Sequence, residues 1–191
     1  GERKYVEPAK GTVNPRVFID RLAKKMPANV TVVADVGQNQ IWTCTEYKFR
    51  KEGRLLTSGG MGTMGYSVPA AIGAKMADNS RATVAICGDG AFQMSFMELA
   101  TAVQFGVDIK VVVMTNNRLG MVRELQTNGY HDRQTAVFLD GSPDFIKLAE
   151  AYGIPAMRVY DDDTMEKGIE MLAEHKGICL VEVVVDKDMP T

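Results

Sequence analysis

One carboxylate and one pair of amides stand out as groups whose type and spacing could do chemistry. Asp89 lies between Gly88 and Gly90, and 25 residues separate Gly90 from the pair Asn116-Asn117. The flanking glycines let a ligand approach the backbone closely, because neither carries a Cβ atom. A carboxylate combined with amide or backbone oxygens is a hard-oxygen donor set. Such a set suits Mg²⁺ or Ca²⁺ bridged to a phosphate, and it does not suit zinc.

Four polar, glycine-bearing turns contain or flank these residues. They span residues 35–40, 58–65, 88–93 and 115–120. Each offers backbone N–H groups, helix N-termini or neutral amides, which are the groups that hold a phosphate. Three of the turns follow directly after an apolar run, and the turn at 58–65 precedes a helical stretch. The sequence therefore predicts a phosphate-binding edge where these turns come together.

The elements that must position these turns alternate along the chain. Apolar runs predict strands at 30–34, 55–56, 82–87, 108–114, 156–159 and 179–185. Helical patterns lie at 13–26, 41–47, 69–77, 94–105, 119–126, 144–152 and 164–174. The expected core face of the helix at 94–105 consists of Met97, Leu99, Ala100, Ala102 and Val103. Strands separated by helices predict a single α/β domain with a mostly parallel sheet of about six strands and helices on both faces. Ligands bind such sheets at the carboxyl ends of the strands.

Composition excludes several classes of protein. Of 191 residues, 46% are hydrophobic and the formal net charge is −2, which argues against disorder and against nucleic acid or an anionic membrane as main partner. No apolar run is long enough for a membrane span, and no secretory signal opens the chain. Cys44, Cys87 and Cys179 are widely spaced, which predicts buried free thiols in a reducing, cytoplasmic setting. The chain has only two histidines, which argues against a histidine-based zinc site and against a Ser-His-Asp triad.

Other interpretations of the same residues stay open at this point. Gly60, Gly62 and Gly65 fit a G-x-G-x-x-G dinucleotide motif with Asp89 as its acidic residue. Asp89 could also be a plain turn residue. The acidic run at 161–163 precedes a helix and reads as a solvated cap rather than as a metal site.

Longer motifs carry a resemblance to a known family. Gly-Asp-Gly followed at this spacing by Asn-Asn resembles the signature of thiamine-diphosphate enzymes. The stretches VGQNQIW, TSGGMGTMGYSVPAAIGA, GDGAFQMSFMELATA and LGMVRELQ resemble the C-terminal cofactor-binding domain of acetohydroxyacid (acetolactate) synthase catalytic subunits. The similarity continues from SPDFIKLAEAYGI to VEVVVDKD and covers nearly the whole chain apart from the first dozen residues.

The resemblance implies roles for particular residues. It implies that Mg²⁺ is held by Asp89, by Asn116 and by the main-chain oxygen of Arg118, and that Met64 supports the bent form of thiamine diphosphate. The implied cofactor-binding set is Val36, Gly37, Gln38, Asn39, Gly62, Met64, Gly88, Asp89, Gly90, Ala91, Met94, Asn116, Arg118, Gly120, Met121 and Val122. The implied substrate pocket contains Met121, Val122 and Leu125, although helical packing alone explains Val122 and Leu125 equally well.

The implied reaction belongs to a larger enzyme. Such an enzyme decarboxylates pyruvate on thiamine diphosphate and condenses the hydroxyethyl carbanion with a second 2-oxo acid, in branched-chain amino-acid synthesis. The activating glutamate belongs to an N-terminal pyrimidine-binding domain and FAD to a middle domain, so no catalytic residue is assigned here. The family shares its sites between subunits of a homodimer or tetramer, with a small regulatory subunit as a possible partner. We expect residues 1–12 to form a flexible or junction segment and 13–191 to form the domain, which would be inactive alone.

Two departures from the family pattern limit what is implied. Leu125 stands where many members carry a tryptophan linked to preference for 2-ketobutyrate, so that preference is in doubt. Thr115 precedes Asn116-Asn117, which shifts the asparagine pair, and spacing from Asp89 keeps Asn116 as the implied ligand. The alternatives are another thiamine-diphosphate-dependent decarboxylase or carboligase, of glyoxylate carboligase or benzoylformate decarboxylase type, and a non-catalytic binding or assembly module.

Overall fold

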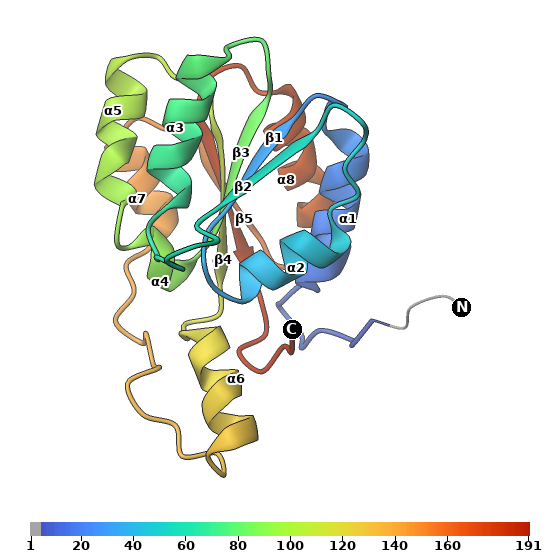
Figure 1. Cartoon of the computed structure of the whole chain (residues 1–191), viewed down its shortest axis with the longest axis vertical. Coiled ribbons are helices and arrows are strands. Elements are labelled where there is room, and N and C mark those ends of the chain that lie inside the picture. Colours follow the sequence, from blue (N-terminus) through green and yellow to red (C-terminus); the bar gives the residue numbers. More distant parts are fainter. Residues whose placement is uncertain (1–4) are drawn as a thin grey trace.

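A six-stranded parallel sheet forms the centre of the molecule (Figure 1). The computed structural model describes residues 5–191; the first four residues of the segment expected to be flexible lie outside the described residues. The strands are β1 (Thr31–Ala34), β2 (Arg54–Thr57), β3 (Thr83–Gly88), β4 (Lys110–Thr115), β5 (Ala156–Val159) and β6 (Cys179–Val184). Their order in the sheet is β2-β1-β3-β4-β6-β5, and every pairing is parallel. The predicted fold class is confirmed.

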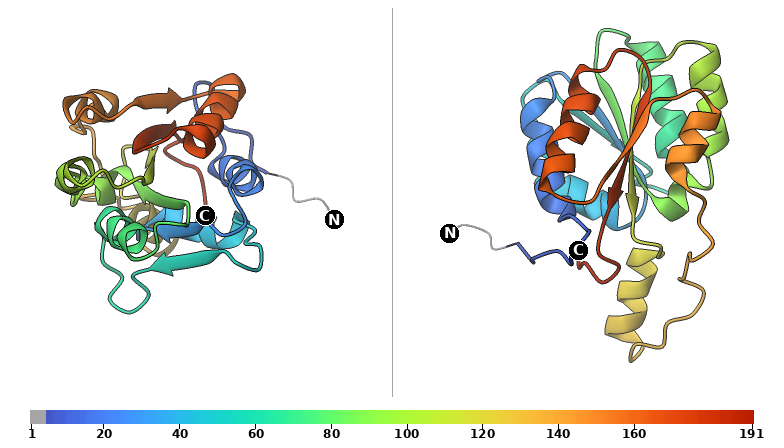
Figure 2. Two further views of the ribbon diagram at one scale, coloured as in Figure 1. Left: turned by 90° about the horizontal axis from the view of Figure 1, so that it is seen from above. Right: turned by 180° about the vertical axis from the view of Figure 1, so that it is seen from behind.

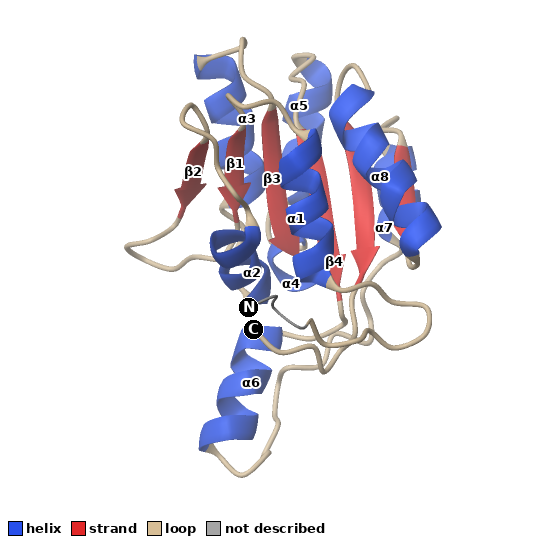
Figure 3. Cartoon of the chain, turned by 90° about the vertical axis from the view of Figure 1, so that its right-hand side faces the viewer, coloured by secondary structure: helices blue, strands red, loops and turns tan. Residues whose placement is uncertain are grey.

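Helices cover both faces of the sheet. They are α1 (Pro15–Lys25), α2 (Gln38–Glu46), α3 (Ser67–Ala77), α4 (Asp89–Phe92), α5 (Leu99–Gln104), α6 (Gly120–Gly129), α7 (Phe145–Ala151) and α8 (Asp162–Glu174), with a 3₁₀ turn η1 at Phe96–Glu98. Helices α1, α2 and α8 lie on one face, and α3, α5 and α7 on the other (Figures 2 and 3). Side chains alternate along each strand. Val32 and Val84 therefore join the core under α1, while Val33 and Ala85 join the core under α3.

Local signals in the sequence fix several helix ends. The side chain of Asn14 accepts hydrogen bonds from the backbone N–H groups of Arg16 and Val17, so it caps α1. Asp161 caps α8 in the same manner, which confirms the acidic run there as a helix cap. Helix α2 starts three residues earlier than predicted. The chain passes Gly37 at φ 145°, a conformation that favours glycine, and can enter the helix at once.

The helix predicted at 94–105 forms over most of its length, but its predicted start and part of its predicted core face are wrong. Ser95 has φ −145° and separates α4 from the next helical segment, which therefore begins with η1 at Phe96 and continues directly into α5. Leu99 and Ala102 are buried, but Met97, Ala100 and Val103 are exposed. The expected burial of all three thiols is also wrong, because Cys44 is exposed while Cys87 and Cys179 are buried and free.

Helix α6 projects beyond the carboxyl edge of the sheet (Figures 1 and 3). The return segment after it is tied to the start of the helix, because Leu119 N donates to Val137 O at 2.9 Å and Leu139 N donates to Asn117 O at 3.0 Å. The Arg118 guanidinium lies 4.6 Å from the centre of the Phe138 ring. In the part of the chain that the structure describes, no helix has the length and apolar character needed to cross a membrane.

Candidate functional site

The turns after β1, β3 and β4 meet at the carboxyl edge of the sheet, beside the start of α6. A pocket opens there between the four segments. Its lining residues are Val36, Gly37, Gln38, Asn39, Trp42, Met64, Gly88, Asp89, Gly90, Ala91, Met114, Asn116, Arg118, Leu119, Gly120, Met121 and Val122. Parallel strands deliver these segments to one edge because each strand runs in the same direction.

Among the described residues, Asp89 is the one carboxylate in this lining. Its Oδ1 accepts from Gly90 N at 2.8 Å, and its Oδ2 accepts from Asn116 N at 3.1 Å and from Asn117 N at 2.6 Å. The turns after β3 and β4 therefore touch through this side chain. Burial raises the pKa of Asp89 to about 6, and the backbone N–H donors partly oppose that effect. Among the described residues no cationic side chain forms an ion pair with Asp89, so its charge is available to a bound cation.

Asn116 is held in a fixed orientation beside Asp89. Its Oδ1 accepts from Arg118 N at 3.1 Å, and its Nδ2 donates to Gln38 Oε1 at 3.0 Å. The Oδ1 atom retains a second lone pair, because an amide oxygen has two. The next residue, Asn117, has φ 54°, a left-handed conformation that asparagine tolerates better than most residues. This bend turns the chain back toward α6.

The first turn of α2 supplies the amides on the opposite wall. Gln38 Nε2 donates to Met189 O at 2.9 Å, and Asn39 Nδ2 donates to Asp35 O at 2.8 Å and to Ile86 O at 3.2 Å. Both side chains are buried. These hydrogen bonds fix the orientations of both side chains, because buried amide groups in proteins are almost always hydrogen bonded.

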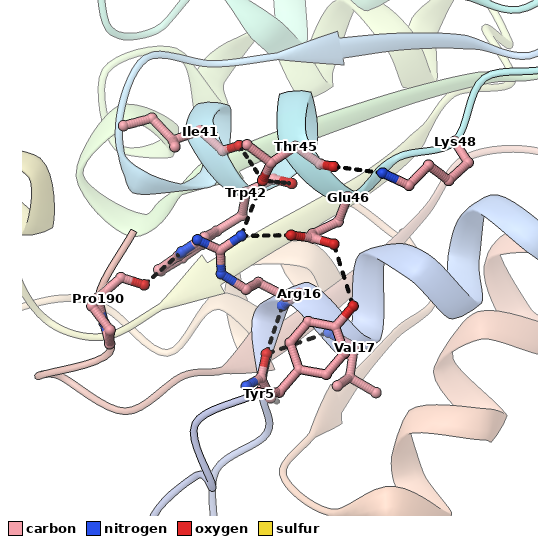
Figure 4. Close-up of polar contacts among 10 residues, drawn as sticks. Tyr5, Arg16, Val17, Ile41, Trp42, Thr45, Glu46, Lys48 and Pro190 are labelled. Carbon is pink, nitrogen blue, oxygen red and sulfur yellow. Dashed lines mark hydrogen bonds and ion pairs between the residues drawn. The ribbon is translucent and has the colours of Figure 1, made fainter. Parts of the chain in front are cut away.

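Contacts on the outer side of α2 fix the helix itself (Figure 4). Trp42 Nε1 donates to Pro190 O at 2.9 Å, and Arg16 pairs with Glu46 at 2.6 Å. Tyr5 donates its hydroxyl hydrogen to Glu46 as well, at 3.3 Å. The helix that carries Gln38 is thereby tied to α1 and to the C-terminal segment.

Two glycines let the pocket walls approach each other. A Cβ atom on Gly120 would lie 1.9 Å from Gln38 Oε1 and 3.1 Å from Asn116 Nδ2. A Cβ atom on Gly90 would lie 2.6 Å from Leu119 Cδ2. All three distances are shorter than an ordinary van der Waals contact. A side chain at either position would displace groups of the pocket.

Most of the residues expected at the site line this pocket, and three do not. Gly62, Met94 and Leu125 lie outside the lining, and the residues Met94 and Leu125 are 55% and 61% exposed. Three lining residues were not predicted, namely Trp42, Met114 and Leu119. Helical and strand spacing could have found two of them. Trp42 lies four positions after Gln38 on α2, and Met114 lies two positions before Asn116 on one side of its strand.

The donor set is compatible with magnesium and a phosphate group. In the part of the chain that the structure describes, no cluster of three or more His, Cys, Asp or Glu residues could hold a metal ion. A metal here would use one carboxylate and neutral oxygens, which is how proteins hold Mg²⁺ together with the oxygens of a phosphate. The close approach at Gly90 and Gly120 leaves backbone rather than side chains facing a ligand. The residues therefore fit such a group.

Comparison with known proteins assigns the chain to a family. Residues 35–183 match the family described as "Thiamine pyrophosphate enzyme, C-terminal TPP binding domain". The chain is 38% identical over 181 residues to the acetolactate synthase large subunit of Lactococcus lactis subsp. lactis (strain IL1403), a match that covers 95% of this chain and 31% of the relative. It is 37% identical over 190 residues to the mitochondrial acetolactate synthase catalytic subunit of Saccharomyces cerevisiae, covering 97% of this chain and 28% of the relative.

A third relative, the large subunit of acetolactate synthase isozyme 2 of Escherichia coli, is 34% identical over 184 residues, covering 96% of this chain and 33% of the relative. The chain thus spans about a third of the length of these relatives. The dinucleotide interpretation is wrong, because the family is a different one and because Gly60 and Gly62 lie outside the pocket lining. The chain belongs to the thiamine pyrophosphate enzymes, and it corresponds to their C-terminal cofactor-binding domain.

Proposed function

We propose that residues 13–191 are the thiamine diphosphate- and Mg²⁺-binding domain of an acetolactate synthase. The whole enzyme would decarboxylate pyruvate and join the two-carbon unit to a second 2-oxo acid. The observation that carries the proposal is the contact between two distant turns, in which the Asp89 carboxylate accepts N–H groups of Asn116 and Asn117 at one rim of the sheet. The names of the relatives support the choice of reaction.

Each part of the pocket has a separate task in this proposal. Asp89, the amide oxygen of Asn116 and the carbonyl of Arg118 would hold Mg²⁺. The backbone at Gly37 and Gly120 would face the diphosphate, and the backbone N–H groups of Gln38 and Asn39 at the start of α2 would donate hydrogen bonds to it. Thiamine diphosphate, when bound, supplies the carbanion chemistry. Met64 and Val122 would exclude water on the apolar side.

The remaining parts of the enzyme belong to the proposal and lie outside this chain. We propose that a pyrimidine-binding domain of another subunit completes the site in a homodimer or tetramer, and that FAD binds elsewhere in the full-length enzyme. A cytoplasmic location fits the unpaired cysteines, although the name of the Saccharomyces cerevisiae relative includes a mitochondrial location. Because half of the site is absent, this chain alone should not form acetolactate from pyruvate.

Calorimetric titration with thiamine diphosphate tests the binding proposal. The chain should bind the cofactor in the presence of Mg²⁺ and far more weakly after chelation with EDTA. Asp89→Ala should remove the Mg²⁺-dependent part of the affinity. An unchanged affinity in Asp89→Ala would count against Asp89 as a metal ligand. Steady acetolactate formation by the wild-type chain alone would refute the proposal of an incomplete site.

A further inference from the structure

A second buried carboxylate lies next to the pocket without lining it. Asp35 follows β1, is completely buried, and is absent from the lining residues. Its Oδ1 accepts from Val36 N at 2.9 Å and from Gly65 N at 3.0 Å, while its Oδ2 accepts from Ser67 N at 2.8 Å. No cationic side chain among the described residues forms an ion pair with it. All of its described hydrogen-bond donors are backbone N–H groups.

These bonds connect two segments that are distant in sequence. Val36 begins the turn that leads into α2, whereas Gly65 and Ser67 end the glycine-rich loop and begin α3. Helix α3 has no cap of its own, since the residue before it, Tyr66, has a helical backbone and makes no side-chain capping bond. Asp35 therefore supplies from a neighbouring strand the acceptor that a helix N-terminus requires.

The glycine-rich loop brings one side chain into the pocket. Met64 lines the pocket, and its Cε atom lies 3.3 Å from the position that a Cβ of Gly90 would take. The residue that follows Met64 is Gly65, whose N–H is bound by Asp35. Gly65 has φ 83°, so the backbone bends sharply at the residue whose N–H group donates to Asp35. The position of Met64 thus depends on the anchor at Asp35.

We propose that Asp35 is a positioning residue that clamps the loop carrying Met64 against the turn after β1, and so shapes the apolar wall of the cofactor pocket. This inference rests on the proposed function for its effect on cofactor binding. The clamp itself does not depend on a bound ligand, because all of its hydrogen bonds lie within the chain.

The first experiment tests the clamp without any cofactor. Amide hydrogen exchange is measured by NMR on the wild-type chain, on Asp35→Asn and on Asp161→Asn. Asp161 is the matched control, because it also caps a helix, α8, but lies away from the pocket. Gly65 and Ser67 amides should be protected in the wild type, should exchange at least about tenfold faster in Asp35→Asn, and should not change in Asp161→Asn. Unprotected Gly65 and Ser67 amides in the wild type would overturn the clamp even if the variants failed to fold.

The second experiment tests the effect on the pocket. Thiamine diphosphate affinity with Mg²⁺ is measured for the wild type, Asp35→Asn, Met64→Ala and the double variant, by fluorescence of Trp42, which is the single tryptophan and lines the pocket. Asp35→Asn should weaken binding about tenfold, as expected for a lost charge-assisted hydrogen bond. It should add little in the Met64→Ala background, because the clamp acts through Met64. Additive effects, or no effect in Asp35→Asn, would overturn the role in positioning.

The two experiments separate this inference from the proposed function. If the wild-type chain bound no thiamine diphosphate while Gly65 and Ser67 behaved as expected, the proposed function would fail and the clamp would stand. If the wild type bound the cofactor but the amide exchange rates of Gly65 and Ser67 were unchanged in Asp35→Asn, the clamp would be disproved and the proposed function would stand.

Discussion

Two neighbouring strands of the sheet, β1 and β3, are each followed by an aspartate, and the two aspartates are used differently. Both side chains are buried and accept backbone N–H groups. Asp89 lines the pocket, where a ligand can reach it, whereas Asp35 is enclosed between β1 and the start of α3. The same residue type at equivalent strand ends thus serves a ligand in one case and the fold in the other. The difference is that the glycine-flanked turn at Asp89 leaves its carboxylate accessible to a ligand, whereas the surroundings of Asp35 do not.

Removing each carboxylate in turn tests whether Asp35 is structural and Asp89 is not. Asp35→Ala leaves three N–H donors without an acceptor, that of Ser67 buried and those of Val36 and Gly65 partly buried, which should lower the free energy of unfolding by about 3 kcal/mol. Asp89→Ala should change it by less than about 1 kcal/mol, because water in the pocket can bind the freed N–H groups. Urea denaturation of both variants measures the difference. Equal losses would show that Asp89 is as structural as Asp35.

A second prediction concerns the close approach beside Asp89. In Gly120→Ala the new Cβ would overlap Gln38 Oε1, so Gln38 must release Asn116. Thiamine diphosphate affinity with Mg²⁺ should fall about thirtyfold, corresponding to about 2 kcal/mol of strain. Gly129→Ala is the control, because it lies on the same helix and its Cβ meets nothing within 4 Å. Normal affinity in Gly120→Ala would show that the contact between Gln38 and Asn116 is dispensable.

Such close contacts mark the limit of what the sequence could predict. Apolar runs such as those at 82–87 and 108–114 were sufficient for the sheet, because buried parallel strands consist of little else. The glycine-flanked Asp89 and the asparagine pair were visible from residue type and spacing. The late start of the helix after Ser95 was not, because the backbone conformation of Ser95 depends on the chain packed around it. The role of Asp35 was also hidden, since its partners are N–H groups of a loop 30 or more residues away.

A third prediction uses the raised pKa of Asp89, which is about 6 against an ordinary value of 3.8. Between about pH 4 and 6 the unliganded fold binds a proton that the unfolded chain does not, so this group favours the fold increasingly as the pH falls. The same proton competes with Mg²⁺. Mg²⁺-dependent cofactor affinity should therefore fall about tenfold per pH unit below 6.

Calorimetry from pH 5 to 8 measures this effect, and Asp89→Asn is the control, because an amide does not titrate in this range. The profile of the variant reports the titration of the ligand itself. Identical pH profiles for the wild type and the variant would contradict a role for Asp89 ionisation.

The smallest expected effect concerns Cys87, which lies on β3 just before Gly88. Burial raises its pKa well above the ordinary value, with further contributions from Asp35 and Asp89. In the native wild type a thiol reagent such as DTNB should react with Cys44, whereas Cys87 and Cys179 should be slow. Asp35→Asn should accelerate the labelling of Cys87 severalfold by loosening the end of β1. Asp89→Asn should accelerate it less, because it removes only a small electrostatic contribution to the pKa of Cys87. Fast labelling of Cys87 in the wild type would contradict its enclosure.

The central claim is that the turns after β3 and β4 share one divalent ion. Anomalous scattering from crystals grown with Mn²⁺ and thiamine diphosphate would locate that ion directly, since Mn²⁺ prefers the same oxygen ligands as Mg²⁺. We predict one strong peak within bonding distance of the Asp89 carboxylate and the Asn116 amide oxygen. A peak bound to neither side chain, with the cofactor present in the pocket, would contradict the account.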